Sequence, residues 1–174
     1  MARAAKEADG TLGEEELLDD AAEVAAFRGI CARALYLSVD RPELRFAAKE
    51  LARRRAAPTR ADLRALKRLG RYLKGRHRLV MVYQLQGEAA GKRNPAHLYA
   101  PLDSNWADCR ETRRSTSGGA LLRGGQTLAT WSVTQAAHAL SSGEAEFYAL
   151  LKGVVEVLGF NAIAEELQVE LRTP

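Results

Sequence analysis

The chain has 174 residues, with 26 lysines and arginines against 22 aspartates and glutamates, so its formal net charge is only +4. This length accommodates one domain, or one domain with a helical appendage. The sequence has no uninterrupted apolar run near ~20 residues, which excludes an evident membrane span, and its acidic N-terminal stretch lacks the apolar core of a secretory signal. We therefore expect an intracellular protein, cytoplasmic or nuclear, with no membrane partner.

Charge is unevenly distributed along the chain. Residues 1–26 contain two basic and eight acidic side chains, residues 41–78 contain fourteen basic and three acidic, and residues 141–174 contain two basic and six acidic. A basic block between acidic ends indicates contact with a polyanion such as nucleic acid. Cys31 and Cys109 lack metal-ligand spacing, so we interpret them as free thiols.

The first part of the chain predicts a disordered start followed by helices. Residues 1–16 are small, charged and aperiodic, which is typical of disorder. One helix is predicted from Leu17 through Phe27 towards Tyr36, and a second over residues 43–55, because Pro42 suits a first helical turn. The domain boundary is predicted near residues 76–77.

A third helix, predicted over residues 59–74, carries cations along one side. Thr59 and Asp62 have the spacing of an N-cap and its N3 partner, and Gly75 suits the residue after the helix. The predicted nucleic-acid-binding cations are Arg64, Lys67, Arg68, Arg71 and Lys74. Such a stripe attracts phosphates without reading base sequence. The alternative is a solvated helix face.

Strands are predicted downstream of the helices. Apolar runs predict strands over residues 79–85 and 97–103, with a polar loop over residues 87–95. Residues 112–118 form a basic, hydroxyl-rich loop. The Gly124–Gly125 pair between the apolar runs 119–123 and 127–132 is a hairpin signal, because glycine supplies the positive φ angles of a tight turn.

Two carboxylates are candidate functional groups. Asp103 ends the predicted strand. Ser141 and Glu144 have the spacing of a capping box, so a helix begins there and places Glu146 beside an apolar stripe with Phe147 and Leu150. Burying a carboxylate among apolar side chains is unfavourable unless it is paired or binds a metal.

Four motifs in this order resemble the ribonuclease H domain of copia-type retrotransposon polyproteins. They are LDSNWAD at 102–108, TRRSTSG at 112–118, TWS at 130–132 and ALSSGEAEFYAL at 139–150. Residues 27–75 resemble the segment that joins reverse transcriptase to ribonuclease H in those polyproteins. The resemblance covers residues 17–171.

The resemblance implies an α/β fold: an incomplete ribonuclease H-like domain over residues 77–174, preceded by a helical connection segment over residues 17–76. That domain would hold three antiparallel strands and one long helix. The implied activity of the intact relative is hydrolysis of the RNA strand in RNA–DNA hybrids. The implied partners are such a hybrid, or other nucleic acid, and the rest of the Pol polyprotein.

The resemblance also assigns catalytic and metal-binding roles to Asp103 and Glu146. Asn105 stands where the family usually has a second aspartate, and Asp108 where it usually has glycine. The family's third and fourth metal-binding acids have no counterpart in this sequence. We therefore expect weak Mg²⁺ binding at an incomplete site and no cleavage by this chain alone, since Mg²⁺ needs several oxygen ligands. Arg113 and Arg114 are candidate phosphate contacts, or are solvated.

Two other functions remain open at the level of sequence. The chain could be a non-catalytic module that binds nucleic acid through its basic helices, or a decayed element without function. Metal-dependent hydrolysis of a hybrid separates the first hypothesis from both alternatives. Salt-dependent binding without cleavage separates the module from the decayed element.

Overall fold

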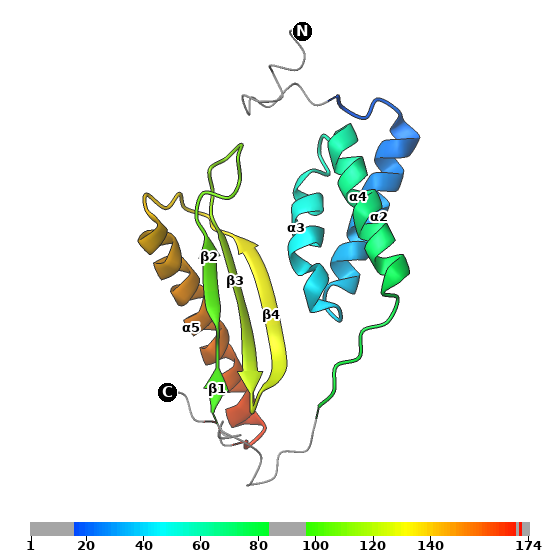
Figure 1. Ribbon diagram of the computed structural model, residues 1–174. Helices are drawn as coiled ribbons and strands as arrows, with labels where there is room; N and C mark the ends of the chain where they lie inside the picture. The colour runs from blue at the N-terminus through cyan, green and yellow to red at the C-terminus, as the bar shows by residue number, and fades with distance from the viewer. Residues whose placement is uncertain (1–15, 84–96, 170, 172–174) are drawn as a thin grey trace. The chain divides into compact units, whose positions relative to one another are not determined.

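The computed structural model describes residues 16–83, 97–169 and 171, and the chain divides into two compact units between Leu79 and Val80 (Figure 1). We call residues 1–79 the helical unit and residues 80–174 the sheet unit. Each unit has its own cluster of buried apolar residues. Apart from Glu16, the predicted disordered segment 1–16 lies outside the described residues.

The helical unit contains helices α2 (Ala21–Leu37), α3 (Arg45–Arg53) and α4 (Arg60–Gly75), with a 3₁₀ turn η1 (Pro42–Leu44) before α3. The helices pack around small and medium apolar side chains. The buried cluster consists of Leu18, Phe27, Cys31, Ala34, Leu44, Ala48, Leu51, Leu66 and Leu69. Burying such side chains is the main force that holds short helices together, because isolated helices of this length are marginal in water.

The helix starts follow from their caps. Helix α2 begins later than predicted, because the Asp20 carboxylate accepts a hydrogen bond from the Ala22 N–H at 2.9 Å and so marks the first turn. Leu17 instead forms a backbone bridge with Thr59. Helix α4 begins as predicted: the Asp62 N–H donates to Thr59 Oγ1, and the Asp62 carboxylate accepts from the Thr59 N–H.

The sheet unit contains strands β1 (Leu98–Tyr99), β2 (Leu102–Asn105), β3 (Thr116–Arg123) and β4 (Gln126–Thr134), followed by the long helix α5 (Ser142–Glu166). Strands β1 and β2 pair with β3 in one continuous antiparallel register, so they form one row interrupted at residues 100–101. Strand β4 is also antiparallel to β3. The predicted α/β arrangement of antiparallel strands with a long C-terminal helix is therefore confirmed.

The β3–β4 hairpin turns where the sequence predicts. Gly124 and Gly125 have φ angles of 56° and 87°, in the left-handed region that glycine adopts without strain. Strand β3 begins at Thr116, so it includes part of the predicted loop 112–118. The pairing with β2 explains the extension, because it gives the backbone of residues 116–119 a partner strand.

Helix α5 packs on the sheet through small residues. Ala145, Ala149 and Gly153 are buried on the helix. A Cβ atom at Gly153 would lie 2.4 Å from Leu102 Cδ1, so glycine is what lets the helix approach β2 this closely. The sheet unit's buried cluster is Leu98, Leu121 and Trp131.

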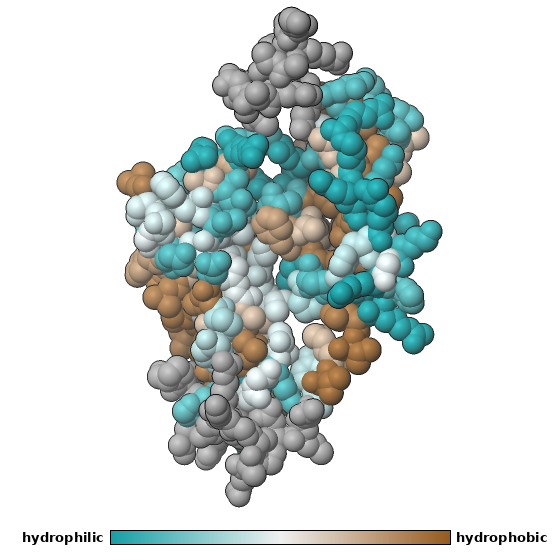
Figure 2. Space-filling model, viewed as in Figure 1, coloured by the Kyte–Doolittle hydropathy of each residue, from teal (hydrophilic) through white to brown (hydrophobic). Residues whose placement is uncertain are grey.

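The outer side of α5 is strongly apolar. Its exposed large side chains are Phe147, Leu150, Leu151, Val154, Val155, Leu158 and Ile163. Apolar residues gather along this helix in Figure 2. Among the described residues, α5 is the one helix long and apolar enough to cross a membrane, by length and composition alone. A helix of this kind is not predicted from the sequence, because Lys152 and Glu156 interrupt the apolar run. Core helices of water-soluble domains have the same property, so the expectation of no membrane partner stays a prediction.

The strand predicted over residues 79–85 is wrong in its described part. Leu79–Tyr83 form no strand, and their large side chains are exposed. Residues 84–85 and the predicted loop 87–95 lie outside the described residues. This β-forming run has no partner strand among the described residues, and propensity alone does not make a ladder. Leu167 and Gln168 form a turn after α5.

Candidate functional site

The first turn of α5 is fixed by side-chain caps. Ser141 Oγ accepts from the Glu144 N–H at 3.1 Å, as the capping-box spacing predicts. The Glu144 carboxylate accepts from the Leu140 N–H at 2.7 Å and from the Tyr148 hydroxyl at 3.0 Å. The latter hydrogen bond raises the pKa of Tyr148 above its ordinary value, because ionising the phenol would place two negative charges together.

Glu146 lies next to strand β2. The Ser104 hydroxyl donates to Glu146 Oε1 at 2.8 Å. Because Ser104 follows Asp103 in β2, this contact holds the carboxylate of α5 beside the residue next to Asp103. The sequence argument from burial is wrong, however. Glu146 is exposed, and so are Phe147, Leu150 and Val154, because α5 turns its small residues towards the sheet.

Asp103 lies on the other face of the sheet from Ser104. Side chains alternate between faces along a strand. Leu102 lies against Gly153 of α5, so Leu102 and Ser104 face the helix, while Asp103 and Asn105 belong to the opposite, exposed side. The two candidate acids therefore lie on adjacent elements, β2 and α5, but do not project from one face of the sheet. An ion shared by both has to lie at the outer edge of β2.

The available donor set fits a magnesium site incompletely. Among the residues that the structure describes, no group of three or more histidine, cysteine, aspartate or glutamate side chains is placed to hold a metal ion. Asp103 and Glu146 supply two carboxylates, whereas Mg²⁺ requires near-octahedral oxygen coordination and keeps water where protein ligands are few. This donor set does not fit a pair of ions.

The loop between β2 and β3 is anchored to the residues before α5. The Trp106 indole N–H donates to the Ala139 carbonyl at 3.0 Å, and Ser115 Oγ accepts from the Ala107 N–H at 3.0 Å. Arg113 and Arg114 are both exposed, and Arg113 has a φ of 54°. The loop thus presents two cations to solvent from an anchored backbone.

Sequence reasoning missed two residues that organise this region. Gln135 is buried, and its amide donates to Ser117 Oγ and to the Ala145 carbonyl, each at 2.9 Å, which ties β3 to α5. The Ser104 hydroxyl ties β2 to α5 through its hydrogen bond to the Glu146 carboxylate. Neither residue has a distinctive spacing, so no local signal in the sequence could have identified the pairing.

The predicted basic stripe is present on α4. Arg64, Lys67, Arg68, Arg71 and Lys74 are all exposed, and they line an open hollow of about 1010 Å³. Gly70 lies in the same hollow and has open space where a side chain would be. None of the five cations forms a hydrogen bond or ion pair with another residue in the described part of the chain.

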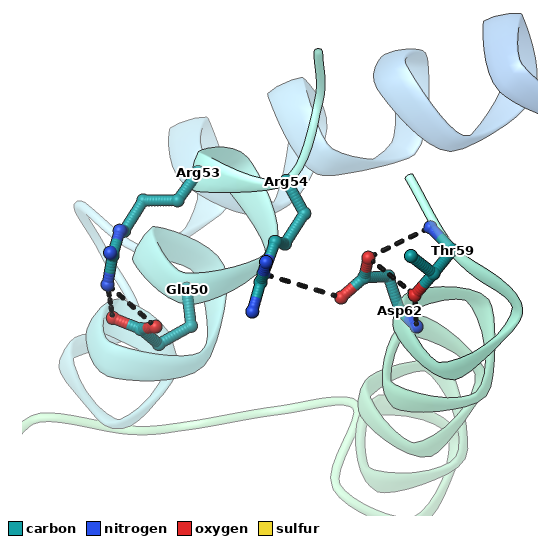
Figure 3. Close-up of polar contacts among 5 residues, drawn as sticks. All are labelled: Glu50, Arg53, Arg54, Thr59 and Asp62. Carbon is teal, nitrogen blue, oxygen red and sulfur yellow. Dashed lines mark hydrogen bonds and ion pairs between the residues drawn. The ribbon is translucent and has the colours of Figure 1, made fainter. Parts of the chain in front are cut away.

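Several other cations of the helical unit are paired with acidic side chains. Arg60 Nη1 lies 2.7 Å from Glu23 Oε2, and Arg41 Nε lies 2.6 Å from Glu43 Oε1. Figure 3 shows two further pairs: Arg53 with Glu50 at 3.2 Å, and Arg54 with Asp62 at 3.9 Å. These four acids thus pair with cations outside the stripe rather than with the stripe itself.

Comparison with known proteins identifies several similar sequences. The chain is 33% identical over 131 residues to the uncharacterized mitochondrial protein AtMg00810 of Arabidopsis thaliana, covering 75% of this chain and 52% of that protein. It is 30% identical over 148 residues to the retrovirus-related Pol polyprotein from transposon RE1 of the same plant, covering 85% of this chain and 10% of the polyprotein. It is 35% identical over 125 residues to secreted RxLR effector protein 161 of Plasmopara viticola, covering 71% of this chain and 83% of that protein.

The chain thus spans about half the length of the first relative and a tenth of the polyprotein. No family model matches the sequence. No solved structure matches it either. The matches to two Pol polyproteins agree with the resemblance of the ordered motifs. The chain belongs to the family of copia-type retrotransposon Pol polyproteins.

Proposed function

We propose that this chain is a ribonuclease H-like segment of a Pol polyprotein that binds nucleic acid but does not cut it alone. The observation that carries the binding is the stripe of five exposed, internally unpaired cations on α4. Cations without a carboxylate partner gain most from a phosphate, since no ion pair has to be broken first. In the intact relative, the proposed reaction is hydrolysis of the RNA strand of an RNA–DNA hybrid.

The absence of cleavage follows from the donor set. Hydrolysis at a two-metal site requires ligands that clamp both the attacking and the leaving oxygen. Asp103 and Glu146 provide two carboxylates, and only Glu146 lies on the α5 side of the sheet. The test is incubation of a labelled RNA–DNA hybrid with the purified chain and Mg²⁺ or Mn²⁺. Cleavage that is lost in both Asp103→Asn and Glu146→Gln would contradict this part of the proposal.

Binding is tested with charge-removing variants of α4. The variant with Gln at positions 64, 67, 68 and 71 is expected to bind duplex and hybrid far more weakly than the unmodified chain. The double variant Lys67→Gln/Arg71→Gln is compared with Arg33→Gln/Arg110→Gln, which removes the same charge from exposed positions elsewhere. Equal binding by the two double variants would show that net charge, rather than the stripe, attracts nucleic acid.

Two other functions differ from this proposal in their outcomes. A non-catalytic module would bind nucleic acid without cleavage and would stay inactive when joined to the remaining Pol sequence. A decayed element would show neither salt-dependent binding nor cleavage. The unpaired stripe favours binding over decay, because a helix face that only has to be solvated gains nothing from keeping five like charges together.

A further inference from the structure

An apolar groove lies between α3 and α4, next to the basic stripe. It has a volume of about 540 Å³, which is within the range of small-ligand sites. The buried side chains of Leu51 and Leu69 line it, and two aromatic residues, Phe46 and Tyr72, are 49% and 39% exposed at its rim. Arg68 lines both this groove and the basic hollow, so the two surfaces are continuous.

The groove is unsuited to a phosphate but suited to an uncharged ring. Its acidic lining residues, Glu43, Glu50 and Asp62, repel anions, and each is already paired with a cation of the chain. Figure 3 shows the pairs that Glu50 and Asp62 form. The unpaired cations lie on the other side of Arg68, in the basic hollow. A ligand that spans both surfaces therefore needs an anionic part and an uncharged, flat, apolar part side by side.

Tyr72 is the aromatic side chain available for stacking. The Lys49 ammonium lies 5.0 Å from the centre of the Phe46 ring and so occupies one face of that ring. The side chain of Tyr72 forms no hydrogen bond or ring contact with other residues in the described ranges. Tyr72 follows Arg68 by four residues, so the ring and the guanidinium are neighbours one helical turn apart.

We propose that the helical unit binds single-stranded nucleic acid, with the sugar-phosphate backbone on the α4 stripe and one base stacked on Tyr72 in the α3–α4 groove. This inference rests on the proposed nucleic-acid binding and specifies its substrate class. An unpaired base can leave the strand and enter the groove, whereas the bases of a duplex are paired and stacked on one another. Stacking on an aromatic ring tolerates every base, because each has a flat apolar face.

The test uses a short single-stranded oligonucleotide carrying 2-aminopurine, whose fluorescence falls when its ring stacks, and a duplex of the same sequence. We expect the full chain to bind the single strand more tightly and to quench its fluorescence. Tyr72→Leu should weaken single-strand binding between about fivefold and a hundredfold, the range for loss of one stacked base, and should abolish the quench. Duplex binding should change by less than about twofold.

Three control proteins make the outcomes decisive. Tyr72→Phe keeps the ring and should bind as the unmodified chain, while Tyr36→Leu removes an 82% exposed tyrosine that does not line the groove and should have no effect. Unchanged circular dichroism shows that each variant is folded. If Tyr72→Leu binds normally while the four-Gln stripe variant is weakened, stacking is overturned and the proposed function stands. If the stripe variant also binds normally, both fail.

Discussion

At the scale of single residues, the sheet unit depends on two glycines that no helix or strand propensity requires. Because Gly153 has no side chain, Leu102 can pack against α5. Gly119, in β3, lies between Leu102 and Trp131: a Cβ atom there would be 2.4 Å from Trp131 Cζ2 and 2.8 Å from Leu102 Cδ2. The ring of Trp131 is buried, so it has little room to move. The close packing of α5, the helix that carries Glu146, on the sheet thus depends on the absence of side chains at Gly119 and Gly153.

Gly119→Ala is therefore expected to destabilise the sheet unit by about 1–3 kcal/mol, the usual effect of overpacking a core. Gly159→Ala is the matched control, because no atom besides its chain neighbours and the helix's own backbone lies within 4 Å of its Cβ position. That substitution should stabilise α5 by up to about 1 kcal/mol through helix propensity. Urea unfolding followed by Trp fluorescence measures both. Equal stability of the two variants would show that Trp131 does not pack against Gly119.

At the scale of elements, local signals predicted the structure well where the element is fixed by its own residues. The Thr59–Asp62 capping box defines the start of α4, Ser141 defines the start of α5, and the Gly124–Gly125 turn defines the hairpin. Local signals failed for Leu79–Tyr83, where a strand needs a partner that the run itself does not specify. They also failed for the orientation of α5.

Helix α5 shows why its orientation could not be predicted from sequence. Its apolar residues surround the helix almost completely, so periodicity does not distinguish the packed side from the exposed side. The stripe containing Phe147 and Leu150 has the larger side chains, and we expected it to be buried. The small residues Ala145, Ala149 and Gly153 form the packed side instead, because they allow closer contact with β2.

The juxtaposition of β2 and α5 leads to a prediction about Mg²⁺. We expect one weakly held ion at the outer edge of β2, contacting Asp103 and Glu146, with a dissociation constant of roughly millimolar or weaker because two carboxylates replace little of its water. Ser104→Ala should alter this affinity only if the hydrogen bond to Glu146 Oε1 competes with the ion. NMR titration of backbone amides is the measurement. Absence of Mg²⁺-dependent shifts near either acid would mean that the carboxylates do not converge.

At the scale of the whole molecule, the exposed apolar surface of α5 is the dominant feature of the sheet unit. Large contiguous apolar patches on a protein surface mark contact with another surface. Within the described residues, β2 and β4 each also pair on one side only, which leaves backbone N–H and C=O groups available to another strand. Both features lead us to expect that the isolated chain associates with itself.

We predict concentration-dependent self-association of the purified chain. Val155→Glu/Leu158→Glu places two charges on the exposed side of α5 and should shift the sedimentation profile towards monomer without changing the helix content. The control is Tyr36→Glu, which places a charge at an exposed position of α2. Val24→Glu would be unsuitable, because Val24 packs on the core of the helical unit. A chain that stays monomeric at high concentration and melts cooperatively would show that the exposed surfaces are tolerated.

The central claim is that the internally unpaired stripe on α4 is a nucleic-acid-binding surface, and the salt dependence of binding tests it most directly. Each phosphate contact contributes a slope of about −0.9 to a plot of log affinity against log salt concentration for duplex DNA. Four or five contacts predict a slope of about −4 for the unmodified chain. The variant with Gln at positions 64, 67, 68 and 71 should have a slope near −1 or shallower. Equal slopes for the two proteins would contradict the account.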